Sequence, residues 1–176
     1  STLTGTDLTG AKLAGANIDY AALTNADLSG ANLTGASLDF SNLAGTDFTG
    51  AIVSGARFIG VTSSGFTAAQ LYSTLSYQTK TLGGIGLGGN DLTGWDFHEQ
   101  NLAGANFDDA TLTNANLAGA NFTNASLASS TLTDANLAGA NLSNSSLASS
   151  TLTNANLAGA NLNNASLYFS TLTGAN

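Results

Sequence analysis

The chain has 176 residues, of which 43% are hydrophobic and only 8% are charged, and its net charge is −8. Its three basic residues are too few to neutralise a row of phosphates, which argues against nucleic-acid binding. The absence of cysteine excludes a disulfide framework and thiolate metal sites. No apolar run reaches the roughly eighteen residues that a membrane-spanning helix needs.

A five-residue repeat runs through residues 1–60. Its central residue is large and apolar, as at Leu8, and a small residue such as Thr6 stands two positions earlier. In extended backbone these two side chains share one face and their polar neighbours share the other. Glycine stands two positions after the centre in nine of the twelve units, where it tolerates the positive φ of a corner. Four corners close a square coil of twenty residues, so we expect a β-solenoid.

The repeat breaks in residues 61–90, which we expect to form an insertion. Thr67 and Gln70 match a helix capping box, so a short amphipathic helix is predicted from Ala68 to about Tyr77. The helix is either a protruding recognition element or, as we favour, a cover over exposed coil edges. A glycine-rich stretch, residues 82–89, is expected to be irregular backbone that rejoins the solenoid. The apolar face of the helix is carried by Leu71, Tyr72 and Leu75.

The repeat resumes in residues 91–176, where a twenty-residue unit recurs in tandem: NLAGANFTNASLASSTLTDA is followed by NLAGANLSNSSLASSTLTNA. A fixed short period is the sequence signature of a solenoid. We therefore predict an all-β quadrilateral solenoid of about seven coils. Blocks 1–60 and 91–176 would form one continuous rod, interrupted by 61–90.

The unit A-(D/N)-L-x-x resembles the pentapeptide-repeat family. It is seen in Ala26-Asp27-Leu28-Ser29-Gly30 and, with phenylalanine at its centre, in Ala105-Asn106-Phe107. The resemblance covers 1–60 and 91–176, and it implies a right-handed quadrilateral β-helix with leucine or phenylalanine inside. The segment from Leu71 to Trp95 also resembles an interruption found in some bacterial members. The family has no shared enzymatic activity, and some members mimic B-form DNA and bind type II topoisomerases, so membership implies a fold more than a function.

His98 and Glu99 are the one candidate for acid–base chemistry. They are the only histidine and the only glutamate, and both fall on outward positions of one unit. A histidine beside a carboxylate can act as a general base, but no nucleophile and no cleft are specified. We interpret the pair as solvated surface side chains. No metal-ligand spacing is present, so we predict no enzyme activity and no cofactor.

Acidic residues form two predicted columns along the first block. A column of carboxylates on a narrow rod could imitate phosphates and engage a basic partner, such as a type II topoisomerase or another DNA-binding protein. The alternative is that these are solvated side chains at a position that the repeat prefers. The first column contains Asp7, Asp27 and Asp47, and the second contains Asp19 and Asp39.

Threonine pairs recur once per coil in the second block. Both members flank an inward leucine, so they should form two parallel rows on one outer face. This pattern resembles the Thr-x-Thr arrays of ice-binding β-solenoids, although tandem duplication alone would copy it as well. The rows contain Thr111, Thr113, Thr131, Thr133, Thr151, Thr153, Thr171 and Thr173.

The repeat reaches both ends of the chain, where an exposed coil would present unpaired strand edges. We therefore favour a non-enzymatic structural or interaction solenoid that pairs with a protein partner or with itself, end to end, into filaments. A bacterial, extracellular or cell-surface location is expected rather than a cytoplasmic one. Tyr20, Phe40 and the Tyr168-Phe169 pair could be lateral contact sites or covers for the insertion. The candidate end-to-end contact residues are Leu3, Leu8, Leu167 and Leu172.

Overall fold

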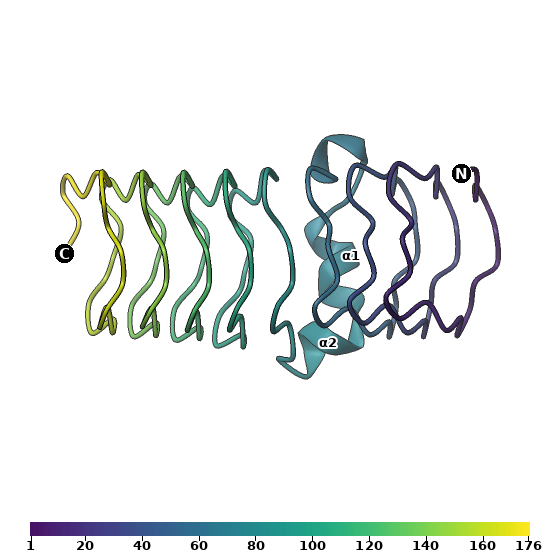
Figure 1. Cartoon of the computed structure of the whole chain (residues 1–176), viewed down its shortest axis with the longest axis horizontal. Coiled ribbons are helices and arrows are strands. Elements are labelled where there is room, and N and C mark those ends of the chain that lie inside the picture. The colour runs from purple at the N-terminus through teal and green to yellow at the C-terminus, as the bar shows by residue number, and fades with distance from the viewer. The chain divides into compact units, whose positions relative to one another are not determined.

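The computed structural model describes all 176 residues as two compact units, Ser1–Gly86 and Leu87–Asn176. In each unit the chain winds into right-handed quadrilateral β-helical coils, so the predicted all-β solenoid is confirmed (Figure 1). Successive coils are joined by parallel β-bridges between residues twenty apart, such as Asn32↔Ile52 and Asn121↔Asn141. The predicted twenty-residue coil is therefore present in both units.

Each five-residue unit ends in a tight turn. In the first unit of the chain the N–H of Thr6 donates to the carbonyl of Leu3 over 3.1 Å, and Gly5 between them has a φ of 63°. A positive φ at the third residue of such a turn is typical of type II. In residues 87–176 the same corner position often holds asparagine, aspartate or serine, for example Asn144 (φ 58°) and Ser149 (φ 60°). Asparagine and aspartate tolerate this left-handed region better than other residues with a Cβ.

The large central residues fill the interior of the coils. Leu28, Leu33 and Leu127 are completely buried, and the small residues two positions earlier, such as Ala26, are nearly so. Aromatic residues pack edge to face along the inside of the second unit: the ring centroids of Phe97 and Phe107 lie 5.5 Å apart. Burying a leucine or phenylalanine side chain contributes roughly 1.5–3 kcal/mol, so this inner column is the main source of stability.

The insertion in the first unit contains a 3₁₀ turn and two short helices (Figure 1). These are η1 (Thr62–Ser64), α1 (Ala68–Ser73) and α2 (Leu75–Gln78). The predicted capping box is confirmed, because Thr67 caps Gln70 and the Gln70 side chain accepts from the N–H of Thr67. The prediction of a single helix from Ala68 to about Tyr77 was wrong, because the segment forms two helices. Thr74 is extended (φ −68°, ψ 147°), since its side chain caps α2 while its N–H donates to the carbonyl of Leu71.

The insertion supplies hydrogen bonds that a further coil would otherwise make. Gln70 Nε2 donates to the carbonyls of Leu43 and Thr46, both over 2.8 Å. In addition, the N–H of Leu75 donates to the carbonyl of Ala51 over 2.9 Å. Leu71 is buried against the coil, whereas Leu75 is 42% exposed. These contacts describe a cover over the edge of the third coil.

The glycine-rich stretch 82–89 is regular, which corrects our expectation of irregular backbone. Leu82 and Leu87 are fully buried central residues, and Gly84 occupies a corner with a φ of 71°. Gly86 forms a parallel bridge with Arg57 and lies so close to it that a Cβ would be 3.3 Å from Arg57 Cγ. The repeat therefore resumes at Leu82, within the predicted insertion, because glycine can replace the outward polar residues without changing the backbone path.

Candidate interaction surfaces

An exposed aromatic pair stands at one corner of the first unit. The rings of Tyr20 and Phe40 are stacked with centroids 5.3 Å apart, and they are 72% and 49% exposed. Both residues have φ values near those of the corner glycines, 54° and 56°. A left-handed conformation costs a residue with a Cβ about 1–2 kcal/mol. Phe40 also covers the next corner, where a Cβ on Gly60 would lie 2.7 Å from the ring. We call Tyr20 and Phe40 the aromatic corner.

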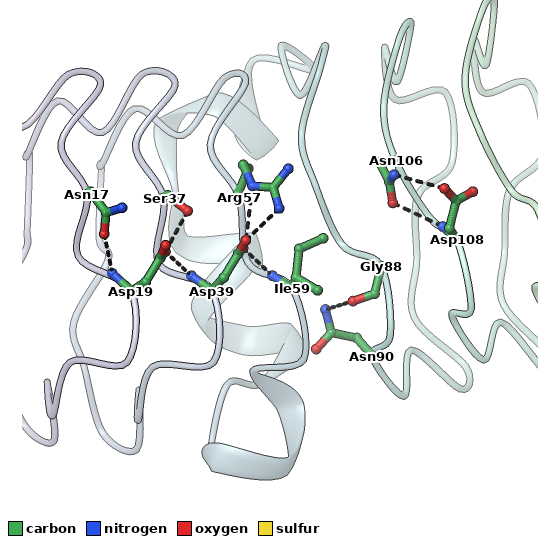
Figure 2. A network of polar contacts seen from close by, with 10 residues as sticks. All are labelled: Asn17, Asp19, Ser37, Asp39, Arg57, Ile59, Gly88, Asn90, Asn106 and Asp108. Atoms are coloured by element: carbon green, nitrogen blue, oxygen red, sulfur yellow. Dashed lines mark hydrogen bonds and ion pairs between the residues drawn. The ribbon is translucent and has the colours of Figure 1, made fainter.

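The carboxylates beside the aromatic corner are bonded from coil to coil (Figure 2). Asp19 accepts from the backbone N–H of Asp39 over 2.9 Å and from the Ser37 hydroxyl. Asp39 in turn accepts from the N–H of Ile59 over 2.9 Å and forms an ion pair of 2.6 Å with Arg57. The two aspartates are one coil apart, as expected. Their carboxylates, however, bond to the following coil, and Asp39 is only 6% exposed. We call such a coil-to-coil carboxylate contact a brace.

The second unit contains the same brace. Asp108 accepts from the N–H of Ala128 over 2.9 Å and from the Ser126 hydroxyl. Asn106 Nδ2 donates to its other oxygen over 3.0 Å (Figure 2). In all three cases an aspartate after a central residue is followed eighteen residues later by serine or arginine. That spacing is a sequence signal for the brace, and our sequence reasoning missed it.

The first acidic column is formed as predicted, because Asp7, Asp27 and Asp47 are joined by parallel bridges. Each carboxylate also closes its own turn; Asp27, for example, accepts from the N–H of Ser29 over 2.9 Å. The backbone and side-chain hydrogen bonds of Thr9 lower the pKa of Asp7. Those of the Ser29 side chain and backbone lower the pKa of Asp27. Asp7 and Asp27 therefore stay ionised at neutral pH, and the turn hydrogen bonds of all three carboxylates give the column a structural role.

The threonine rows of the second unit are aligned as predicted. Thr111, Thr131, Thr151 and Thr171 are joined in sequence by parallel bridges, one coil apart. Their partners in the second row stand on the other side of buried leucines such as Leu132. We call the eight threonines the threonine face.

The outer coils of the chain have half-exposed interiors. Leu3, Leu8 and Leu167 are half-buried and Leu172 is 38% exposed, whereas central leucines of inner coils are fully buried. Directly after Leu167, Tyr168 and Phe169 are 68% and 78% exposed, and their ring centroids are 4.0 Å apart.

The histidine–glutamate pair lies on the surface of the second unit. His98 Nε2 and Glu99 Oε1 are 3.5 Å apart, and both side chains are about half exposed. The structure contains no group of three or more histidine, cysteine or acidic side chains arranged to hold a metal ion. Its helices are all too short or too polar to cross a membrane.

Comparison with known proteins identifies the repeat. The family model described as pentapeptide repeats matches eight copies, over residues 1–30, 26–62, 91–128, 105–144, 125–167 and 140–176. A comparison with curated proteins gave no match.

Solved structures of similar proteins are also found. A pentapeptide repeat protein of the Arabidopsis thaliana thylakoid lumen is 36% identical over 51% of this chain and 62% of its own, with a TM-score of 0.49. HetL of Nostoc, involved in heterocyst differentiation regulation, is 32% identical over 99% of this chain and 63% of its own, with a TM-score of 0.42. QnrB1, a plasmid-mediated fluoroquinolone resistance protein, is 17% identical over 99% and 90%, with a TM-score of 0.47.

This chain thus spans less than two thirds of the length of the first two relatives. The matches to the family model cover most of the sequence, leaving only residues 63–90 outside. The matched residues form coils of the structure, and residues 82–90 join them although the family model does not match this stretch. The chain belongs to the pentapeptide-repeat family.

Proposed function

We propose that the chain is a non-enzymatic structural scaffold that associates with further copies of itself, head to tail. The observation that carries the proposal is the complementarity of the two backbone edges of a coil, because one edge donates where the other accepts. Of the candidate contact residues, Leu172 is 38% exposed, and Leu3 and Leu167 are half-buried. A second copy would bury these leucines at about 25 cal/mol per Å² of apolar surface removed from water.

The backbone edges of a coil support a head-to-tail arrangement. In each pair of coils the earlier coil donates from its central residue, as Leu127 N–H does to the Ser146 carbonyl over 2.7 Å. The later coil donates back from the residue before its own centre, as Ser146 N–H does to the Ala125 carbonyl over 3.0 Å. The two edges of a coil are therefore complementary rather than alike. A contact between the unlike ends of two copies is heterologous. A heterologous contact that does not close into a ring produces filaments.

The exposure of the His98–Glu99 pair supports the non-enzymatic part of this proposal. His98 and Glu99 are both about half exposed, so water surrounds the pair and competes with any substrate for its hydrogen bonds. We keep a location outside the cytoplasm as a prediction. Exposed aromatic side chains, Tyr20, Phe40, Tyr168 and Phe169, are candidate lateral contacts for a protein partner.

The acidic alternative, mimicry of DNA towards a topoisomerase, has weaker support. Its second column is engaged internally, because Asp19 accepts from the next coil and Asp39 is paired with Arg57. Only the column of Asp7, Asp27 and Asp47 is left for a partner, and each of these carboxylates already accepts a turn N–H.

The test uses the 176-residue chain. Light scattering over a wide concentration range should give a mass that rises with concentration, and electron microscopy should show linear assemblies. Leu172→Lys should abolish the rise, because it places a charge in the apolar contact. Leu3→Lys should do the same from the opposite end.

The matched control is Ala138→Lys, which adds the same charge at a half-exposed outward position of an inner coil of the second unit. It should assemble like the parent. A strictly monomeric parent would refute the proposal, and so would equal loss of assembly in the control and in Leu172→Lys.

A further inference from the structure

The threonine face is the only outer surface of the second unit in which both flanking positions repeat the same hydroxyl-bearing side chain through four coils. Thr131 and Thr133 stand on either side of buried Leu132, and Thr151 and Thr153 on either side of buried Leu152. Neighbouring coils place equivalent residues about 4.8 Å apart, and two residues of extended backbone span roughly 6.6 Å. The result is a two-dimensional grid of hydroxyl and methyl groups.

The hydroxyl groups of this grid have no hydrogen-bond partner within the protein, unlike the amides of the neighbouring columns. Asn141 Nδ2 donates to Thr123 Oγ1 over 3.0 Å, and Asn161 Nδ2 donates to Asn141 Oδ1 over 3.1 Å. Asn141 Oδ1 also accepts the N–H of Ser143 in its own turn. The asparagine column is thus accounted for by internal bonding. The threonine face is not.

Backbone hydrogen bonds between adjacent coils hold the grid rigidly. The N–H of Leu132 donates to the carbonyl of Thr151 over 2.7 Å, and the N–H of Thr131 donates to the carbonyl of Ala110 over 2.9 Å. Threonine is also stiff at χ1, since it is branched at Cβ. A rigid surface loses little conformational entropy when a partner binds.

The chemistry of the face selects its partner. Its two rows contain no charged residue, and Asp134 stands at the corner beside them, where it accepts from Asn154 Nδ2 over 3.1 Å. A threonine hydroxyl both donates and accepts hydrogen bonds, so the regular rows suit a partner that presents a regular lattice of groups that do the same. We propose that the threonine face binds the ordered water lattice of an ice crystal.

Ice binding is tested by thermal hysteresis of the 176-residue chain, with uptake into a growing ice hemisphere as a second readout. The parent should show both. Thr133→Leu combined with Thr153→Leu should lose both, because it removes two hydroxyl groups from the centre of the grid and adds bulk. Circular dichroism and the Tm show that the variant remains folded. If the double variant does not fold, the single variant Thr173→Leu replaces it, because Thr173 is exposed.

The matched control is Ala138→Leu combined with Ala158→Leu, which places the same leucine side chains at equivalent outward positions of the adjoining face and adds more bulk than the threonine variant does. It should retain hysteresis and ice uptake. A parent without hysteresis and ice uptake overturns the proposal. Equal loss in the control and in the threonine variant overturns it as well, since the effect would then not belong to this face.

Discussion

At the scale of single residues, the corner positions decide which side chains the chain can present to a partner. Every coil needs a positive φ there, and most corners of the first unit use glycine. Tyr20 and Phe40 accept the same backbone conformation with large exposed rings. The stacking of the two rings on each other partly offsets the backbone cost, because aromatic pairs add about 0.5–1.5 kcal/mol. Strain that is kept at an exposed position is more typical of a functional surface than of a structural one.

The cost of a corner can be measured in the second unit. Gly139 has a φ of 67°, and no atom lies within 4 Å of the position that a Cβ would take, so only the backbone opposes a side chain. Gly139→Ala should lower the free energy of unfolding by about 1 kcal/mol. Ser149→Gly, at a φ of 60°, should change it in the opposite direction or leave it unchanged. Urea unfolding checks both, and a Gly139→Ala variant as stable as the parent would contradict this expectation.

At the scale of elements, the insertion replaces coil edges with helix contacts. Gln70 is its central residue, since one side chain closes the capping box and bonds two coil carbonyls. The carbonyls of Leu43 and Thr46 would otherwise lose this donor. A short helix of this length is not stable alone, so its order depends on packing against the coils.

Gln70→Ala should therefore lower the free energy of unfolding by about 1–3 kcal/mol, because the part-buried Thr46 carbonyl loses its donor and the Leu43 carbonyl keeps only the N–H of Thr46. The control is Gln78→Ala, since Gln78 is exposed and its side chain makes one long bond of 3.3 Å to Ser73. Thermal unfolding followed by circular dichroism compares the two. Similar losses in both variants would show that Gln70 does not hold the insertion to the coil.

At the scale of the whole molecule, eleven acidic and three basic residues make the chain strongly anionic. Many of its aspartates bond to backbone N–H groups of turns rather than to cations. The Thr93 side-chain and backbone hydrogen bonds lower the pKa of Asp91, as Thr9 and Ser29 do for Asp7 and Asp27. Stabilisation by these carboxylates is therefore distributed over turns in both units.

The pH dependence of stability follows from these shifts. Because the folded pKa lies below the unfolded value of about 3.9, the contribution is complete above that value and is lost as the pH falls through the folded pKa. The Tm should be constant from neutral pH to about 5 and should fall below about 4. Asp27→Asn should reduce this acid sensitivity, because an amide still accepts the Ser29 N–H. A Tm that rises on acidification would contradict the prediction.

Much of the structure could be predicted from the spacing of residues alone. The five-residue period placed leucine and phenylalanine inside, and the capping box at Thr67 and Gln70 marked the start of α1. The break between the two helices at Thr74 could not be predicted from the sequence. The Thr74 hydroxyl caps α2, but the apolar residues on both sides of it keep helical spacing. The regular path through Gly83–Gly88 was missed since glycine hides the polar half of the repeat, although Leu82, Leu87 and Leu92 kept the five-residue spacing.

The amino-acid sequence by itself determined the solenoid, its coil length and which residues share an outer column, since a strict period leaves one way to bury the leucines. Only the tertiary structure decided which outward groups are satisfied by a neighbouring coil. Asp39 reaches Arg57, and Asn161 reaches Asn141, while the threonine face finds no partner. The physical reason is that these bonds join side chains of adjacent coils, whose reach and rotamers are set by packing rather than by the repeat.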